Sequence, residues 1–191
     1  ADAALYAKYT NEARAYDNQT PLFDPLNLPY DTDWFKEITQ NGLVHNYNLS
    51  MSGGTPNLLY SFSAGYFGDQ GVLKGAEFNR ITLRSNNEYK PFSFLKVGTV
   101  LNANITKSDN KPTGAFTDAY RMGPTAPVRS EDGNYGFIPA LSVSNPVASL
   151  ELANNFDKGN RFQGNLYGEL EPIKNLVFRS SWGFDKFANN N

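Results

Sequence analysis

The sequence has no cysteine among its 191 residues and only one histidine, His45. Without cysteine there can be no disulfide framework, thiolate metal site or cysteine nucleophile, and one histidine argues against a histidine-centred triad or a histidine-rich metal site. The net charge is only −2, so neither a nucleic-acid-binding surface nor a strongly acidic tail is indicated. The N-terminus lacks a basic stretch followed by an apolar one, so we expect no signal peptide.

Long apolar runs are also missing. None approaches the roughly 18 residues of a transmembrane helix, but strands of a membrane barrel carry only an alternating signal. What is abundant is Phe with 14 residues, Tyr with 11 and Asn with 23. Aromatic residues favour strands and Asn favours turns, so this composition predicts an all-β protein.

Apolar and polar residues alternate with a period of two over six segments, which predicts six antiparallel strands. Their expected positions are about 43–52, 58–68, 77–90, 94–106, 161–171 and 176–187. In the second segment Tyr60 and Phe62 share one face while Ser61 and Ser63 share the other. Most of these segments have the 9–11 residues that a tilted membrane strand needs.

Short helices are expected outside the strands. Leu5, Tyr9, Ala13 and Tyr16 recur at helical spacing after Asp2, a suitable N-cap. A proline-rich connection follows. "DTDWFKEIT" then predicts a further helical turn or two, and "NPVASLELANN" predicts a helix whose first position suits proline.

The connections alternate in length. Short turns are expected at 53–57, 90–93 and 171–175, a longer one at 68–76 and a very long one at 107–160. Such a long loop would be unusual in a compact soluble domain, but outer-membrane barrels combine short periplasmic turns with long extracellular loops. We therefore expect an extracellular loop with short helices over 1–42, four barrel strands over 43–106, a long extracellular loop over 107–160 and two further strands over 161–191.

The apolar face of this sheet needs a partner, and in a barrel that partner is lipid. The lipid-facing residues would then include Tyr60, Phe62, Leu83, Leu101 and Trp182. Those lining a wet lumen would include Arg80, Arg84, Glu88 and Asn102. A soluble antiparallel sandwich, whose strands alternate in the same way, is the alternative.

An ordered set of motifs resembles one family. "DTDW", "NYNLSMSGG", "SAGYFGDQGVLKG", "FNRITLRSN" and "LKVGTVLNAN" are similar to the early barrel of SusC/RagA-type TonB-dependent transporters. "AALYAKYTNEAR", "RMGPTAPVRSEDGNY" and "NPVASLE" resemble loops of that family, so the resemblance covers nearly the whole chain.

The resemblance implies a fold and a function. Such transporters are barrels of about 22 strands with a plug in the lumen, so the chain is expected to be a six-stranded fragment without its plug. Family members import oligosaccharides or peptides across the outer membrane of Gram-negative bacteria. Their partners are TonB, acting through the plug, and a SusD-type surface lipoprotein. The resemblance implies a non-enzyme with no cofactor and no nucleic-acid partner.

Individual candidate sites are less distinctive. In the long loop Tyr120, Arg121 and Tyr135 could contact substrate or lipoprotein, or only pack the loop. Asp31 and Asp33 could offer oxygen ligands to Ca²⁺, but carboxylates at a helix start are the favoured explanation, and we expect no metal site. We place His45 beside Tyr47 on the outer face. Two alternatives to a nutrient importer remain open, a non-transporting barrel scaffold and a soluble carbohydrate-binding sandwich.

Overall fold

The computed structural model describes residues 2–190, which divide into two units. One is a sheet built from 42–71, 76–110 and 155–190, and the other is a helical unit built from 2–41, 72–75 and 111–154. Among residues 2–190, no helix is both long and apolar enough to cross a membrane. Each unit is described by itself.

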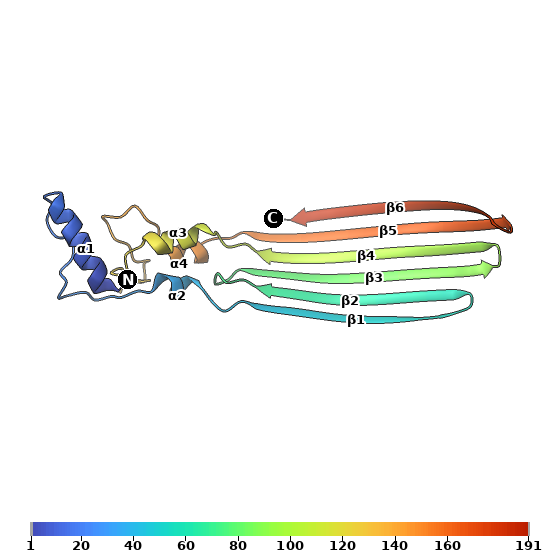
Figure 1. Cartoon of the computed structure of the whole chain (residues 1–191), viewed down its shortest axis with the longest axis horizontal. Coiled ribbons are helices and arrows are strands. Elements are labelled where there is room, and N and C mark those ends of the chain that lie inside the picture. Colours follow the sequence, from blue (N-terminus) through green and yellow to red (C-terminus); the bar gives the residue numbers. More distant parts are fainter. Residues whose placement is uncertain (1, 191) are drawn as a thin grey trace. The chain divides into compact units, whose positions relative to one another are not determined.

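The sheet has six strands in chain order, and each is antiparallel to its neighbours (Figure 1). The strands are β1 (Leu43–Thr55), β2 (Leu58–Gln70), β3 (Glu77–Phe92), β4 (Leu95–Asp109), β5 (Phe156–Ile173) and β6 (Leu176–Asn190). All six expected strands are confirmed, and each is longer than the sequence pattern indicated. The strands were predicted too short because backbone pairing continues beyond the segments in which apolar and polar residues alternate.

Three two-residue turns join β1 to β2, β3 to β4 and β5 to β6, and they gather at one end of the sheet (Figure 1). We call this the short-turn end. The turn between β5 and β6 contains Asn175, whose φ of 72° lies in the left-handed region that asparagine tolerates. Register shifts near the turns after Tyr89 and Leu170 mark irregular pairing there. The turns are therefore shorter than the four- and five-residue connections that we expected.

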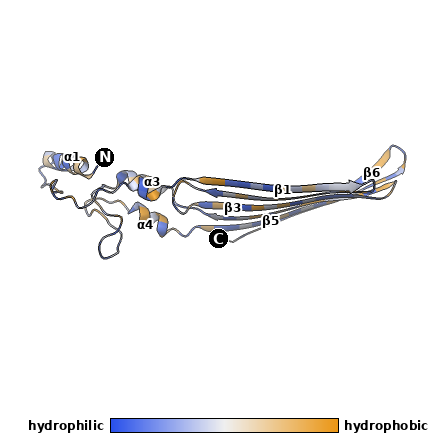
Figure 2. Ribbon diagram, turned by 90° about the horizontal axis from the view of Figure 1, so that it is seen from below, coloured by the Kyte–Doolittle hydropathy of each residue, from blue (hydrophilic) through white to orange (hydrophobic). Residues whose placement is uncertain are grey.

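The strand register places the apolar residues of all six strands on one face. Phe62 pairs with Ser85, and Ser85 pairs with Leu101, so these three side chains share a face. Through intermediate strands the same face also carries Tyr60, Leu83 and Trp182. Figure 2 shows orange and blue segments alternating along the strands. We call this surface the apolar face and the opposite one the polar face.

The apolar face keeps large hydrophobic side chains exposed. Trp182 is 63% exposed, Phe62 44% and Leu101 37%, which is far from the near-complete burial of such residues in a soluble core. Within residues 2–190 the six strands form a single sheet. The second sheet that a soluble sandwich requires is therefore not found in the described part of the chain.

The helical unit contains four helices, two of which begin at aspartates that the sequence places at helix starts. They are α1 (Ala3–Tyr16), α2 (Trp34–Ile38), α3 (Gly114–Arg121) and α4 (Pro146–Glu151). Asp2 accepts a hydrogen bond from the Leu5 backbone N–H, and Asp33 accepts one from Lys36. Such bonds satisfy donors that the first helical turn leaves free. The expected helices at both places are confirmed, as is the helix that begins at Pro146.

Asn145, the cap of α4, joins two segments in the helical unit. Its side-chain oxygen accepts from the backbone N–H groups of Val147 and Ala148, while its nitrogen donates to the carbonyls of Val128 and Gly136. The residue is only 6% exposed, so these bonds satisfy a polar group that would be costly to bury alone.

The core of the helical unit is formed by residues far apart in the sequence. Trp34 and Ile38 of α2 are buried together with Ala115 and Ala119 of α3, and α2, α3 and α4 contact one another. The indole N–H of Trp34 donates to the Gly123 carbonyl at 3.0 Å. Apolar side chains removed from water in this way stabilise the unit.

The long connection runs over 110–155, within the 107–160 that we expected, and it contains α3, a helix that the sequence pattern did not indicate. The β2–β3 connection pairs with a distant segment. Its residue Leu73 forms a bridge with Thr39, and Gln40 donates to the Val72 carbonyl at 2.8 Å.

Candidate functional site

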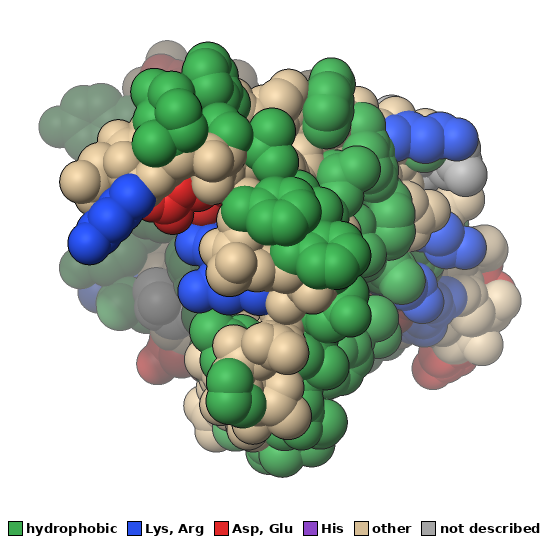
Figure 3. All heavy atoms as spheres, turned by 90° about the vertical axis from the view of Figure 1, so that its right-hand side faces the viewer, with side chains coloured by type: hydrophobic (Ala, Val, Ile, Leu, Met, Phe, Trp, Pro, Cys, Tyr) green, Lys and Arg blue, Asp and Glu red, His purple; other side chains and the backbone are tan. Residues whose placement is uncertain are grey.

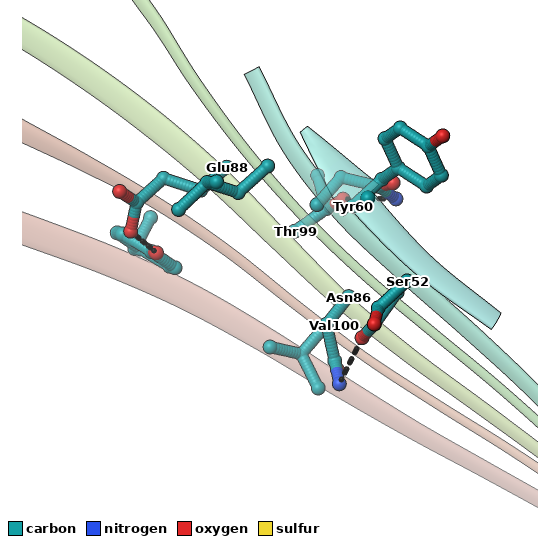
Figure 4. A pocket seen from close by; sticks show the side chains of 11 residues that line it. Ser52, Tyr60, Asn86, Glu88, Thr99 and Val100 are labelled. Atoms are coloured by element: carbon teal, nitrogen blue, oxygen red, sulfur yellow. Dashed lines mark hydrogen bonds between the residues drawn. The ribbon is translucent and has the colours of Figure 1, made fainter. Parts of the chain in front are cut away.

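The centre of the polar face is lined by hydroxyl and amide side chains. Asn86 donates to the Ser61 hydroxyl at 3.3 Å and Thr82 donates to Asn104 at 3.0 Å. A hollow of about 450 Å³ beside the Asn86–Ser61 pair is lined by residues of β1 to β5. Figure 4 shows Asn86 and Val100 on one side of the ribbon and the Tyr60 ring on the other. Groups of this kind both donate and accept hydrogen bonds, as recognition of a sugar or a peptide requires.

An ion-pair ladder crosses four strands of the polar face near the short-turn end. Lys96 on β4 lies 3.7 Å from Glu88 on β3 and 3.1 Å from Glu169 on β5, and Glu169 lies 3.1 Å from Arg179 on β6. Two basic and two acidic groups alternate, so the ladder is electrically neutral. Repeated pairing of this kind fixes the side chains more firmly than an isolated surface pair would.

Tyr167 contacts two members of this ladder, Glu88 and Arg179. Its hydroxyl donates to Glu88 at 3.0 Å, and the Arg179 guanidinium carbon lies 4.5 Å from its ring centroid. The ring lies over Gly98, where a Cβ atom would come within 2.1 Å of the ring carbon Cζ. Gly98 therefore provides the space that the tyrosine ring needs.

Further along the polar face, two arginines of β3 have no acidic partner. Arg84 donates to the Asn102 side chain at 2.8 Å, and Arg80 stacks 5.4 Å from the Phe67 ring centroid. Within residues 2–190 neither arginine forms an ion pair, whereas Arg161 on β5 forms two hydrogen bonds with Asp185. Two guanidinium groups are thus available for a carboxylate or another acceptor.

The structure brings the four predicted lumen residues, Arg80, Arg84, Glu88 and Asn102, onto this one face. Viewed from the short-turn end, hydrophobic side chains run over one side of the sheet, and blue and red side chains lie together on another side (Figure 3).

In the helical unit, a second hollow of about 790 Å³ is bordered by aromatic side chains and helix-capping carboxylates. Tyr120 lies at its edge on α3 and is 81% exposed. Asp31 accepts a hydrogen bond from the Ala3 backbone and Asp33 caps α2, so these two carboxylates act locally within the fold. Arg121, the last residue of α3, is exposed.

Tyr135 belongs to a different cluster. Its hydroxyl donates to Glu151 at 2.6 Å and accepts from Arg129 at 3.0 Å, and the same arginine pairs with Glu151. The hydrogen bond from Tyr135, followed by the Arg129 interaction, lowers the pKa of the Glu151 carboxyl. The bond to Glu151 raises the pKa of Tyr135. The sequence placed Tyr120, Arg121 and Tyr135 in one candidate group, but only Tyr120 borders the second hollow.

These two pKa shifts predict how the Tyr135 cluster depends on pH. The contribution of Glu151 is present above its unfolded pKa of about 4.3 and is lost as the pH falls through the lower folded value. The contribution of Tyr135 is present below its unfolded pKa of about 10 and is lost as the pH rises through the higher folded value. We expect protection of the 130–134 backbone amides against hydrogen exchange to fall on both sides, by less than about tenfold because the groups are exposed. Tyr135→Phe should remove the alkaline fall, and an unchanged alkaline profile would contradict this assignment.

The structure also locates the single histidine. His45 and Tyr47 lie on the apolar face with nearly parallel rings, 6.1 Å between centroids. The expectation that they are neighbours on one face is confirmed, and Tyr47 continues the stack with Tyr66 at 6.3 Å.

Sequence reasoning missed Lys96, Tyr167, Glu169 and Arg179 as members of a polar network. Each lies at a polar-face position of its strand, so its orientation was readable from the alternation. The pairing could not be predicted, because it depends on the register between strands whose paired residues are up to 79 positions apart in the sequence.

Comparisons with known proteins agree with this geometry. The chain is 30% identical over 182 residues to TonB-dependent receptor P26 of Formosa agariphila, covering 93% of this chain and 18% of the relative. It is 32% identical over 187 residues to TonB-dependent receptor SusC of Bacteroides thetaiotaomicron, covering 82% of this chain and 18% of the relative. No family model matches the sequence.

Two solved structures share the fold. The RagAB peptide transporter superposes with a TM-score of 0.68 and 21% identity, covering 98% of this chain and 22% of that one. The RagAB peptide importer in its closed-closed state gives a TM-score of 0.67 and 22% identity, covering 84% of this chain and 19% of that one. The chain thus spans less than a fifth of the curated relatives, and the names of all four proteins describe receptors or transporters rather than enzymes.

Proposed function

Because the chain belongs to the SusC/RagA-type TonB-dependent receptors, we propose that it forms part of the barrel wall of an outer-membrane nutrient importer. The observation that carries this proposal is the sheet itself, in which every strand sends most of its large apolar side chains to one exposed face. A closed barrel with lipid outside and water inside accommodates both faces of such a sheet without a second protein layer.

In this proposal the apolar face meets lipid and the polar face lines the lumen. Tyr60, Phe62, Leu83, Leu101 and Trp182 are then the lipid-facing residues, and Arg80, Arg84, Glu88 and Asn102 line the lumen. The short-turn end lies on the periplasmic side, and the segments that form the helical unit lie outside the cell. Alternate turns of an antiparallel barrel are on opposite sides of the membrane, which supports this arrangement.

The proposed cargo is an oligosaccharide or a peptide. The hydroxyl and amide groups of the polar face suit both classes, since sugars and peptide backbones offer donors and acceptors together. Tyr120 on α3 adds an exposed ring against which a sugar or an aromatic side chain could stack. A SusD-type surface lipoprotein and TonB, acting through a plug, are the proposed partners.

The test is uptake by cells whose transporter gene has been deleted and replaced. Cells carrying the full-length wild-type protein should take up fluorescent oligosaccharides or peptides only when TonB is present. Arg84→Ala should reduce that uptake by about tenfold, because it removes a charged donor that lines the path. Ser85→Ala, one residue away on the apolar face, is the matched control and should leave uptake unchanged.

Two results would contradict the proposal. Uptake that continues at wild-type rate without TonB would exclude TonB-dependent import. Equal surface levels of Arg84→Ala and Ser85→Ala with equal uptake would show that the polar face does not contact the cargo.

A further inference from the structure

The apolar face ends in a row of polar side chains at the end of the sheet away from the short turns. Lys107 on β4 lies two residues beyond Ile105 and so shares its face. The register pairs Lys107 directly with Lys158 on β5 and with Asn79 on β3. This row therefore marks where the apolar face stops.

Two lysines directly opposite each other on neighbouring strands repel, which destabilises the pair of strands unless an anion lies between them. Lys107 and Lys158 are both exposed. Among residues 2–190 the side chain of neither lysine takes part in an ion pair or a hydrogen bond. A third exposed lysine, Lys186, shares this face and pairs in register with Phe162. We call these three residues the lysine patch.

The height of the patch matches the boundary between hydrocarbon and headgroups. From Leu95 to Ile105 the apolar positions of β4 span ten residue steps, or about 34 Å along the strand. At a strand tilt of about 40°, this corresponds to about 26 Å along the membrane normal, close to the apolar band of outer-membrane barrels. Lys107 and Lys158 then lie immediately beyond the band. Lys186, in register with Phe162 and through it with Ala103, lies within the band near this boundary, and its long side chain can extend toward the level of the other two lysines.

Acidic residues lie one row further from the membrane centre. Glu77 and Asp109 are register partners on the same face. Three lysines and two carboxylates leave this end of the apolar face with one net positive charge. The positive groups are those nearest the lipid, so an anion at headgroup level meets the lysines first.

We propose that Lys107, Lys158 and Lys186 bind the phosphate of a phosphorylated lipid in the surrounding membrane. This inference rests on the proposed function, in which the apolar face meets lipid. The phosphate would lie between Lys107 and Lys158 and relieve their repulsion, while its acyl chains would cover the neighbouring rings of the apolar face. The chemistry requires an anion attached to hydrocarbon, which distinguishes a lipid from free phosphate.

The experiment measures lipid retained by the purified full-length transporter in detergent, using native mass spectrometry. The probes are phosphorylated lipid A, the same lipid A after enzymatic removal of its phosphates, and inorganic phosphate. We expect the wild type to retain the phosphorylated lipid. The variant Lys107→Gln/Lys158→Gln should bind it about 30-fold more weakly, and Lys186→Gln about fivefold more weakly.

A matched control removes the same number of positive charges as the Lys107→Gln/Lys158→Gln variant. Lys8→Gln/Lys36→Gln removes two lysines from α1 and α2 and should retain lipid as the wild type does. Equal retention by the patch variant, or equal retention of the dephosphorylated lipid, would overturn the proposal. Inorganic phosphate that competes as strongly as the lipid would show a free-phosphate site and would overturn it as well.

The outcome separates this inference from the proposed function. The patch variant should still transport cargo, because the three lysines lie on the face away from the lumen. If lipid retention is unaffected while uptake remains TonB-dependent, the lysine patch has no lipid role and the proposed function stands. If the wild type neither transports cargo nor tolerates a lipid environment, the proposed function itself is wrong.

Discussion

Leu101→Arg should destabilise the full-length protein in the membrane by about 2–4 kcal/mol. Leu101 lies on the apolar face between Ser85 and Gly164, in the middle of the band that we assign to lipid. An arginine there must either enter hydrocarbon or distort the surrounding bilayer, and both cost free energy. The free energy of unfolding is measured by urea titration of the protein in lipid vesicles.

The control is the next residue on the same strand. Asn102 points to the polar face and accepts a hydrogen bond from Arg84, so Asn102→Arg places the charge in the proposed wet lumen. We expect it to cost less than half as much as Leu101→Arg, with repulsion from Arg84 as its main penalty. If the two penalties were equal or reversed, the assignment of the faces would be wrong.

Trp34→Ala should destabilise the helical unit by about 3–5 kcal/mol. Trp34 is 3% exposed, and its indole N–H donates to the Gly123 carbonyl. The substitution leaves a cavity among α2, α3 and α4 and leaves that carbonyl without its buried donor. Limited proteolysis of the full-length protein should show faster cleavage within 111–154, while hydrogen exchange in the six strands stays unchanged.

Tyr120→Ala provides the comparison for Trp34. Tyr120 is also aromatic and lies on α3, but it is 81% exposed, so its removal should change stability by no more than about 0.5 kcal/mol. Equal protection of 111–154 in the wild type and in Trp34→Ala would show that this tryptophan is not the centre of the core. The loss of stability in Trp34→Phe should lie between those of Trp34→Ala and Tyr120→Ala, since phenylalanine keeps most of the apolar volume but loses the hydrogen bond.

The strands were predictable because their signal is local. The alternation within one strand shows which residues share a face with Phe62, and the same holds for Leu101 in its own strand. The strand register confirms that Phe62 and Leu101 lie on the same face of the sheet. Helix starts were predictable for the same reason. Asp2 and Asp33 cap helices through bonds to residues three positions away, so the evidence lies within a single turn.

The helix α3 was not predictable in the same way. It contains Gly114 and Thr117, which are weak helix formers, and its capping position has no side-chain hydrogen bond. It is stabilised by burial of Ala115 and Ala119, in a core whose other residues come from distant segments. Local sequence patterns do not show which distant segments pack together. The pairing of Lys96 with Glu169 was missed because it too joins distant segments.

The division of the chain into a meander and a composite helical unit has a kinetic consequence. Every strand pairs with its neighbour in sequence, and the β1–β2, β3–β4 and β5–β6 hairpins each close a turn of only two residues, so these three hairpins can form early. The helical unit requires contacts such as that of Thr32 with Ala126, 94 residues apart. Closing so long a loop costs more chain entropy before any contact compensates for it. We therefore expect the three short hairpins to become protected first, and the helical unit and the β4–β5 pairing, which both close long loops, to become protected later.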